Sequence, residues 1–263
     1  MGRVVRRGRA APVAAASSWE RVASWYDGWV GQRGSRYHQA IAIPAVLDLL
    51  DPRPGSRILD IGAGQGVLAP YIVDRGAGYT GVDASPRLIE LARARHAALG
   101  RFIVGDARAL DALPDVRRAT YDAGVFLLSI QDMDPLEPVF QALGRVLRPT
   151  GRVVIFMTHP SFRQARHSGW GFDEGRKLIF RRVDAYLSPM AVPMKSIGGG
   201  PPTRSYHRPL SSYVNGLASA GFSVDAMREL PDLPDDARPP GRRAETRAEA
   251  EIPLFLALRA RRG

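Results

Sequence analysis

The sequence predicts an α/β domain, in which a mostly parallel sheet carries helices on both faces. Short apolar runs such as RILDI and DAGVFLL recur along the middle of the chain, and segments of helical period separate them. The runs are apolar throughout, as in strands that are buried on both faces. Alternating strands and helices place parallel strands side by side, with crossover helices between them. With 263 residues, 45% of them hydrophobic, the chain is long enough for one domain with a sizeable core.

Two helices are expected before the first strand. In SWERVASWYDGWV, Trp19 and Tyr26 belong to a set of apolar residues at helical spacing. A second helix, near 36–50, ends at DPRPG, because proline and glycine do not continue a helix. We therefore predict an N-terminal helical cap over 17–54, preceded by a disordered basic tail at 1–16.

The remaining chain, 55–263, is predicted to form the α/β domain itself. Its regular alternation is interrupted at 158–209, a stretch rich in Gly, Pro, Arg and aromatic residues that has no clear period. An insertion of this length in a compact domain is usually functional or disordered, and we expect a substrate lid there. A Pro/Arg-rich loop is expected at 231–249. We predict strands at 57–61, 78–82, 101–104, 121–127, 151–157, 222–230 and 252–260, and helices near 66–75, 86–98, 135–147 and 210–220.

A glycine-rich turn, ILDIGAGQG, follows the first predicted strand. Its pattern is D-x-G-x-G-x-G from Asp60, and it lacks the third glycine of a dinucleotide fingerprint, a position occupied here by Val67. Glycines at 62, 64 and 66 let the backbone turn sharply and approach a ligand closely. The pattern suits a ligand with an amino-acid end: Asp60 can attract an ammonium group, and the following helix N-terminus can receive a carboxylate.

Two further acids follow the next two strands. Asp83 ends YTGVD, where a carboxylate can accept hydrogen bonds from the hydroxyls of a ribose. Asp106 in IVGDA can accept from an adenine amino group, and the Ala107 N–H can donate to the ring. Each acid taken alone is as well explained by an N-cap of the following helix as by a ligand contact. The three acids in this order favour a ligand site, because ligands of open parallel sheets bind beyond the carboxyl ends of the strands.

These motifs resemble those of the class I (Rossmann-like) methyltransferases that use S-adenosylmethionine. The resemblance extends over about residues 20–260 and rests on LDIGAGQG, VDAS, GDA, YDAGVFLLSIQDM and VLRPTGRVVI. It implies a seven-stranded, mostly parallel sheet whose last strand is antiparallel, with the helical cap and the lid insertion added to it. It also implies a set of cofactor-binding residues, including backbone beside the reactive methyl group at Leu128: Tyr37, Asp60, Gly62, Ala63, Gly64, Asp83, Ala84, Asp106, Ala107 and Leu128.

The cofactor brings the reactive methyl group, so the protein has to orient the acceptor and, where needed, remove its proton. No metal is expected, and a magnesium site at Asp132 and Asp134 is disfavoured. Histidine is the usual proton acceptor at neutral pH. The candidates for catalysis are His38, His207, Tyr206 and Asp132.

The methyl acceptor is predicted to be a small aromatic or apolar molecule, because aromatic residues gather in the cap and in the insertion. Tyr26 either contacts a ligand or packs in the core. The segments MTHPSFR, GWGFDE and YHRPLSSY are similar to a bacterial small-molecule, natural-product branch of the family, in which some members methylate indole carbon 3 of tryptophan-derived cyclic dipeptides. The residues expected to bind the acceptor are Trp25, Tyr26, Trp29, His159, Phe162 and Trp170.

Two alternatives remain open: an RNA methyltransferase, and a cofactor-binding relative that has lost transfer activity. The net charge of +11 favours the first, but several of the arginines lie at the chain ends, so a nucleic-acid partner is disfavoured. The absence of cysteine fits the cytoplasm and excludes a cysteine nucleophile. No apolar run is long enough to span a bilayer, so no membrane partner is expected. A homodimer is a candidate assembly.

Overall fold

The computed structural model of the protein describes residues 17–194, 202–232 and 243–263. The predicted basic tail at 1–16 lies outside the described residues, as do parts of the insertion and of the loop predicted at 231–249. Within the described part, no helix is both long enough and apolar enough to cross a bilayer.

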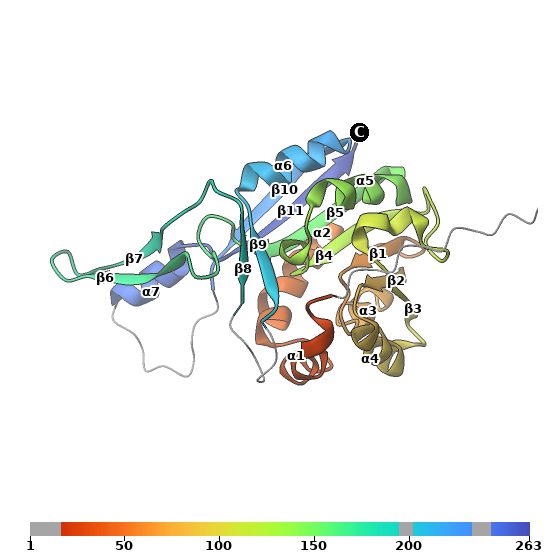
Figure 1. Ribbon diagram of the computed structural model, residues 1–263, viewed down its shortest axis with the longest axis horizontal. Helices are drawn as coiled ribbons and strands as arrows, with labels where there is room; N and C mark the ends of the chain where they lie inside the picture. Colours follow the sequence, from red (N-terminus) through yellow and green to blue (C-terminus); the bar gives the residue numbers. More distant parts are fainter. Residues whose placement is uncertain (1–16, 195–201, 233–242) are drawn as a thin grey trace, which may run out of the picture.

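A seven-stranded sheet forms the centre of the domain, as predicted (Figure 1). Only one of its strands, β11, is antiparallel to its neighbours, and this is the last strand of the chain. The strand order places β1 between β4 and β2: the chain passes from β1 outward to β2 and β3, then crosses back to β4 on the other side of β1. Such a switch point is where open α/β sheets bind ligands. The strands in spatial order are β10 (Phe222–Leu230), β11 (Phe255–Arg262), β5 (Leu147–Thr158), β4 (Tyr121–Leu127), β1 (Arg57–Ile61), β2 (Gly78–Asp83) and β3 (Gly100–Val104).

Helices cover both faces of this sheet. On one face lie α2 (Ile43–Leu50), α3 (Ala69–Val73) and α4 (Pro86–His96), and on the other lie α5 (Leu136–Val146) and α6 (Leu210–Ser219) (Figure 1). In α5, buried residues recur at helical spacing at Val139, Phe140, Leu143 and Val146, which gives the helix one apolar side. Two apolar clusters result, one on each side of the sheet.

The N-terminal cap forms the helices that were predicted for it. A short 3-10 helix, Glu20–Val22, leads into α1 (Ala23–Val30), and a π-helical segment, His38–Ala42, leads into α2. Two contacts attach the cap to α4: Arg95 pairs with Asp27 of α1, and the Glu20 carboxylate accepts from the Ser85 hydroxyl. The cap is therefore held against the C-terminal edge of the sheet.

The insertion contains two hairpins that the sequence pattern did not predict. The first joins β6 (Ser168–Asp173) to β7 (Leu178–Val183), and the second joins β8 (Met190–Pro193) to β9 (Arg204–His207). In the first hairpin neither face is buried, so its sequence has no apolar alternation to reveal the strands. It extends away from the sheet, with α7 (Arg243–Glu251) beside it (Figure 1).

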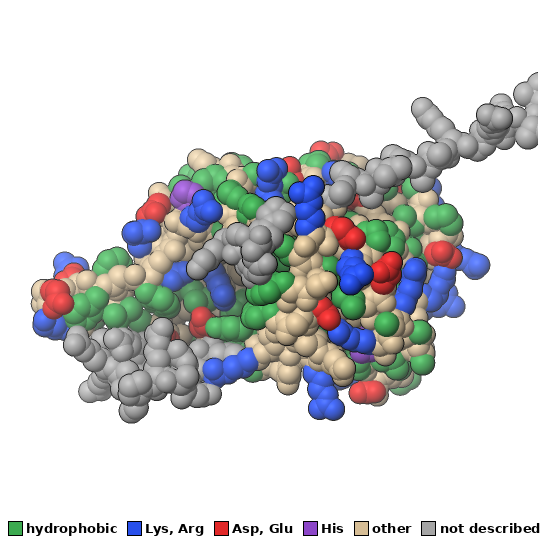
Figure 2. All heavy atoms as spheres, turned by 60° about the horizontal axis from the view of Figure 1, so that its bottom comes forward, with side chains coloured by type: hydrophobic (Ala, Val, Ile, Leu, Met, Phe, Trp, Pro, Cys, Tyr) green, Lys and Arg blue, Asp and Glu red, His purple; other side chains and the backbone are tan. Residues whose placement is uncertain are grey.

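Helix α7 corrects the predicted loop at 231–249. Its sequence, RAETRAEAE, has good helix formers but few apolar residues, and the prediction followed the prolines that precede it. The other differences are at element ends: α3 begins at Ala69 rather than near residue 66, and β11 begins at Phe255 rather than at 252. Charged side chains are dispersed over the face seen in Figure 2, with acidic groups between basic ones.

Candidate functional site

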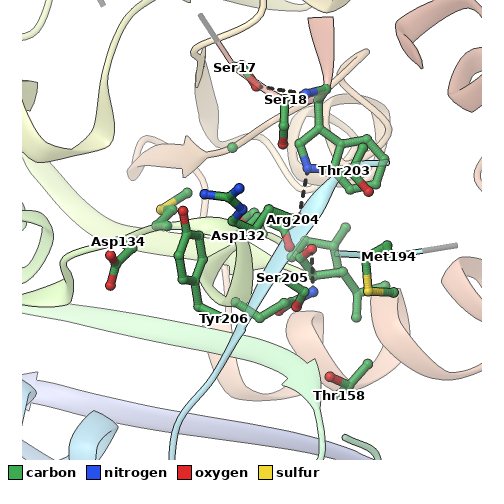
Figure 3. Close-up of a pocket in the computed structure, with 18 of the residues that line it drawn as sticks. Ser17, Ser18, Asp132, Asp134, Thr158, Met194, Thr203, Arg204, Ser205 and Tyr206 are labelled. Atoms are coloured by element: carbon green, nitrogen blue, oxygen red, sulfur yellow. Dashed lines mark hydrogen bonds between the residues drawn. The ribbon is translucent and has the colours of Figure 1, made fainter. Parts of the chain in front are cut away.

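A cavity of about 840 Å³ lies at the C-terminal ends of β1, β2, β3 and β4. Residues from the cap line one side of it, and β9 with the chain before it lines another. Figure 3 shows Thr203, Arg204, Ser205 and Tyr206 following β9 across the cavity, with Ser17 and Ser18 at one end and Thr158 at the other. A cavity of this size is within the range of small-molecule sites.

The glycine-rich turn after β1 forms one wall of the cavity. Gly62 has a φ of +74°, and a Cβ there would lie 2.4 Å from Ser129 Cβ, so this position requires glycine. Gly64 also has a positive φ, but a Cβ there would meet only Tyr26, at 3.7 Å. Gly66 packs its backbone against Phe102. The three glycines thus have different roles, and Gly64 is the one with room for a ligand.

Asp83, at the end of β2, is the central carboxylate of the cavity. Its Oδ2 accepts from the Gly64 N–H at 2.9 Å and its Oδ1 from the Ser85 N–H at 2.8 Å. Burial raises the pKa of this carboxyl, and the two N–H donors oppose that rise. A carboxylate has about four acceptor sites, so hydrogen-bonding capacity remains for a ligand in the cavity.

Asp106 has both a position at the cavity and the helix-capping role that the sequence allowed. It lines the cavity, and it also caps the short helix that follows, accepting from the Arg108 N–H at 2.9 Å. The Arg108 side chain pairs with the same carboxylate at 2.6 Å. Ala107 and Ala84 line the cavity beside it. A contact of Asp106 with an adenine therefore stays a prediction, and its carboxylate already holds an arginine.

Asp60 and Ala63 lie behind the cavity wall rather than in it. Asp60 is 2% exposed; its Oδ2 accepts from the Tyr79 hydroxyl at 2.7 Å, and its Oδ1 has no hydrogen-bond partner. Burial raises the pKa of Asp60 to about 7. Asp60 is not among the residues that line the cavity, and its contact with an ammonium group stays a prediction.

Asp132 faces the cavity from the segment after β4. Its Oδ2 accepts from the Trp19 Nε1–H at 3.0 Å, which joins the cap to this segment (Figure 3). Burial, and secondarily the charge of Asp83, raises the pKa of Asp132 to about 8. No ion pair to Asp83 or Asp132 is present among the described residues. This end of the cavity therefore favours a cationic ligand.

His38 lies at the start of the π-helical segment and lines the cavity. The ring is 3% exposed, and its Nδ1 lies 2.9 Å from the Ser35 hydroxyl. Burial lowers the pKa of His38 to about 4, so the imidazole is neutral at neutral pH. When Nδ1–H donates to Ser35, Nε2 is left as a proton acceptor. π-Helical segments often occur at functional sites.

The other predicted catalytic residues also line this cavity. His207 Nε2 lies 2.7 Å from the Tyr186 carbonyl oxygen and so donates to it, which leaves Nδ1 as the acceptor. The Arg208 guanidinium lies over the Tyr206 ring, with its Cζ 5.2 Å from the ring centroid. Leu128 and Tyr37 are in the lining as well.

Of the residues predicted to bind the acceptor, Tyr26 and Trp29 line the cavity and four others do not. Trp25 stacks against Trp29 at 6.0 Å. His159 Nε2 pairs with Glu229 at 2.9 Å, and Phe162 packs against the His159 ring. Trp170 is 40% exposed on β6 and lies under Arg181. These four occupy positions that packing and pairing explain.

Several lining residues were missed by sequence reasoning. Thr158 ends β5, Met194 and Thr203 come from the second hairpin, and Arg163 and Gln164 follow β5. Thr158 and Arg163 belong to the segment MTHPSFR, whose likeness to a branch of the family gave no role to either residue, and only the tertiary structure brings the five together. Among the described residues, no group of three or more His, Cys, Asp or Glu could hold a metal ion.

The geometry agrees with comparisons to known proteins. Residues 59–155 match a family model described as a methyltransferase domain. An S-adenosylmethionine dependent methyltransferase from Mesorhizobium loti has a similar structure, with a TM-score of 0.68 and 25% identity over 85% of this chain and 99% of that one. The chain contains a class I S-adenosylmethionine-dependent methyltransferase domain. The fold and the cofactor class predicted from the glycine turn and the strand-end acids are confirmed.

Curated relatives of this methyltransferase domain are more distant. A ubiquinone biosynthesis O-methyltransferase of Xylella fastidiosa (strain 9a5c) is 26% identical over 142 residues, 53% of this chain and 58% of that protein. A demethylmenaquinone methyltransferase of Beutenbergia cavernae is 31% identical over 164 residues, 62% of this chain and 60% of that protein. The matched stretch thus spans less than two thirds of either relative.

The residues of the cavity fit the cofactor of this domain. Gly64 leaves room for a ligand, Asp83 keeps acceptor sites beside it, and the carboxyls of Asp83 and Asp132 have no ion-pair partner among the described residues. A cation in the cavity would compensate these two acids. S-Adenosylmethionine carries a sulfonium and an ammonium group, together with ribose hydroxyls that can donate to a carboxylate.

Proposed function

We propose that the protein transfers a methyl group from S-adenosylmethionine to a small aromatic or otherwise apolar molecule. The observation that carries this proposal is that the cofactor residues and the neutral imidazole of His38 line one and the same cavity. Aromatic and apolar side chains stand opposite the strand ends, including Trp29, Tyr37 and Tyr213. A flat, mostly apolar acceptor suits such walls.

We assign the following roles to residues of the chain. When bound, the cofactor supplies an electrophilic methyl group on a positive sulfonium. Gly62 and Gly64 would receive its amino-acid part, Asp83 its ribose and Asp106 with Ala107 its adenine, as the family resemblance implies. The Asp83 carboxylate favours the charged cofactor over a neutral one by its negative potential, and a bound cation in turn favours the ionised form of Asp132. The aromatic wall would orient the acceptor and exclude water.

His38 is the proton acceptor that the geometry favours. It is neutral at working pH, faces the cavity, and is held by Ser35 at 2.9 Å. Asp132 is the second candidate: burial, and secondarily the charge of Asp83, raises its pKa to about 8, so the carboxyl holds its proton through much of the neutral range. The ring nitrogen of His207 and the hydroxyl of Tyr206 lie at the same cavity and remain further candidates.

The nature of the acceptor is supported by the relatives' names. Two curated relatives are named for ubiquinone biosynthesis and for demethylmenaquinone, and quinones are ring compounds. A quinol-type ring is therefore a better first acceptor to test than the indole carbon 3 of a cyclic dipeptide, which no comparison favours. A role in natural-product formation, a cytoplasmic location and a homodimer stay predictions.

The RNA alternative is less well supported. A nucleic-acid enzyme should carry a continuous basic surface beside the cavity. Figure 2 shows basic groups separated by acidic ones on the face in view, and two of the arginines that line the cavity are paired with Asp106 and Asp134. The non-catalytic alternative predicts cofactor binding without transfer to any acceptor.

A radiolabel experiment tests these alternatives together. The full-length protein is incubated with S-adenosylmethionine carrying a labelled methyl group, with a panel of quinols, catechols, phenols and indoles, and separately with total RNA. We expect label in at least one ring compound and none above background in RNA. Label in RNA alone would replace the proposal by the RNA alternative. Binding of S-adenosylhomocysteine without label in any acceptor would favour a non-catalytic relative.

A further inference from the structure

Two buried polar atoms without hydrogen-bond partners lie on neighbouring residues at one end of the cavity. They are Nη1 of Arg163 and Oε1 of Gln164, and both residues belong to the lining together with Thr158, Tyr37 and Phe255. Leaving such atoms unpaired costs stability, and folded proteins rarely do so without a reason. One is a cationic donor and the other a neutral acceptor, so both are poised to bind a polar ligand.

The Arg163 guanidinium is held by aromatic rings rather than by a carboxylate. Its Cζ lies 4.5 Å from the Phe255 ring centroid and 5.8 Å from that of Tyr37. Among the described residues no ion pair to Arg163 is present. Ring faces stabilise the cation by its attraction to their electrons and fix the plane of the guanidinium, but they do not cancel its charge.

Two other arginines of the lining differ in this respect, and a third, Arg204, is exposed to solvent, which screens its charge. Arg108 pairs with Asp106 at 2.6 Å, and Arg208 pairs with Asp134 at 2.5 Å and donates to the Met133 carbonyl oxygen. Their charges are compensated within the protein. Arg163 therefore brings a positive charge to the cavity that the described residues do not compensate.

Gln164 lies directly beside this charge. Its side chain is 5% exposed, its backbone N–H donates to the Ser168 hydroxyl at 2.9 Å, and its Nε2 lies 3.5 Å from the Ser161 carbonyl oxygen. These contacts fix the residue and leave Oε1 free to accept from a ligand. The pair thus offers a charged donor next to an acceptor.

We propose that Arg163 and Gln164 form the recognition site for an anionic oxygen of the methyl acceptor, which is a carboxylate or an ionised ring hydroxyl. Gln164 Oε1 accepts a hydrogen bond from a donor group next to that oxygen. This inference rests on the proposed function and narrows its substrate class from an aromatic molecule to an acidic aromatic one. The cavity then has two ends of opposite charge: the Asp83 carboxylate favours the cationic cofactor, and Arg163 binds the anionic acceptor.

The experiment compares two ligands of nearly equal shape, 2-naphthoate and 2-naphthamide, which differ in charge. Each is titrated calorimetrically into the protein saturated with S-adenosylhomocysteine. We expect the wild-type protein to bind 2-naphthoate about tenfold or more tightly than 2-naphthamide, because a charge-assisted bond to guanidinium is among the stronger hydrogen bonds. In Arg163→Gln the preference should fall to about twofold or less, and Arg163→Lys should keep part of it.

Arg176→Gln is the matched control, because Arg176 is an exposed residue of the β6–β7 turn and its loss removes the same charge far from the lining. It should keep the full preference. Equal binding of the two ligands to the wild-type protein, binding of neither, or a preference that survives in Arg163→Gln would overturn the proposal. Failure of S-adenosylhomocysteine itself to bind would remove the proposed function and this inference with it, so the two failures are distinguishable.

Discussion

At the cofactor end of the cavity, the lining comes from residues that end parallel strands; at the acceptor end, it comes from segments far apart in the chain. Asp83 and Gly64 are joined within one sheet motif by a hydrogen bond from the Gly64 backbone N–H to the Asp83 carboxylate. Tyr37, Arg163 and Phe255 are joined by ring contacts between the cap, the insertion and the last strand. In this protein the cofactor end is therefore built on strand ends and the glycine-rich turn, whereas the acceptor end is built from side chains that only the tertiary structure brings together.

The first prediction concerns the most rigid part of the cofactor end. Gly62→Ala should lower the free energy of unfolding by about 2 kcal/mol or more and abolish measurable binding of S-adenosylhomocysteine, because the added Cβ meets Ser129 at a positive φ. Thermal unfolding and calorimetry measure both effects. Gly28→Ala is the control: a Cβ at Gly28 has open space within α1 and should be neutral or stabilising. Unchanged stability and affinity in Gly62→Ala would contradict this description of the turn.

A second change removes the central carboxylate. Asp83→Ala should weaken S-adenosylhomocysteine binding about 10- to 100-fold, because the ribose hydroxyls lose a charged acceptor. Asp115→Asn, at an exposed carboxylate, is the control and should bind normally. An affinity within about twofold of wild type in Asp83→Ala would show that the ribose is bound elsewhere.

The sequence predicts the cofactor end of the cavity, and the fold that forms it, better than it predicts the acceptor end. The bounds of β1, β4 and β10 agree with the predicted strands, and Gly62, Gly64 and Asp83 line the cavity as predicted. These positions follow local rules: an apolar run, a turn that needs glycine, and an acid at a strand end. Asp60 shows the limit of such rules, because it lies behind the cavity wall, where one of its carboxylate oxygens accepts from the Tyr79 hydroxyl.

The acceptor end could not be predicted in the same way. His159 was expected to contact substrate, yet it pairs with Glu229, which is 70 positions away in sequence. Arg163 ends the segment MTHPSFR and Gln164 follows it, but that segment assigned neither residue a role, and their proposed role rests on tertiary contacts that have no sequence signature. The hairpins were missed because strands without a buried face show no alternation of apolar and polar residues.

A third prediction separates the two ends by kinetics. His38→Ala should lower turnover of an active panel compound by about 10²- to 10⁴-fold, the usual range for loss of a general base, and leave S-adenosylhomocysteine affinity near wild type. His167→Ala, outside the lining, should keep turnover.

The pH profile of kcat should be flat from about pH 5 to 8 if His38 accepts the proton, since burial lowers its pKa to about 4. A rise of kcat through about pH 8 would point to Asp132 instead.

The last expected effect is a change of the unfolding free energy with pH. Asp60 and Asp132 have pKa values raised by burial to about 7 and about 8, so the folded protein holds protons that the unfolded chain has released. Between pH 6.5 and 9 the unfolding free energy of the ligand-free protein should therefore fall with rising pH, by about 2 kcal/mol for Asp132. The lowered pKa of His38 acts below about 6.5, where its contribution rises with pH, and leaves this window unaffected.

Thermal unfolding of the wild-type protein and of Asp132→Asn across this range measures the contribution of Asp132. The variant should lose less stability as the pH rises, and Asp115→Asn should follow the wild-type curve. Parallel curves for all three proteins would mean that Asp132 is ionised in the folded state throughout, and that burial does not raise its pKa to about 8.

The most direct measurement is a crystal structure of the protein with S-adenosylhomocysteine bound. It should place the ribose hydroxyls within hydrogen-bond distance of the Asp83 carboxylate, the amino-acid part against Gly62 and Gly64, and the sulfur toward the part of the cavity that His38 and Arg163 line. A ligand bound away from Asp83, or one that fills the space between Tyr37 and Arg163, would contradict the division of this cavity into a cofactor end and an acceptor end.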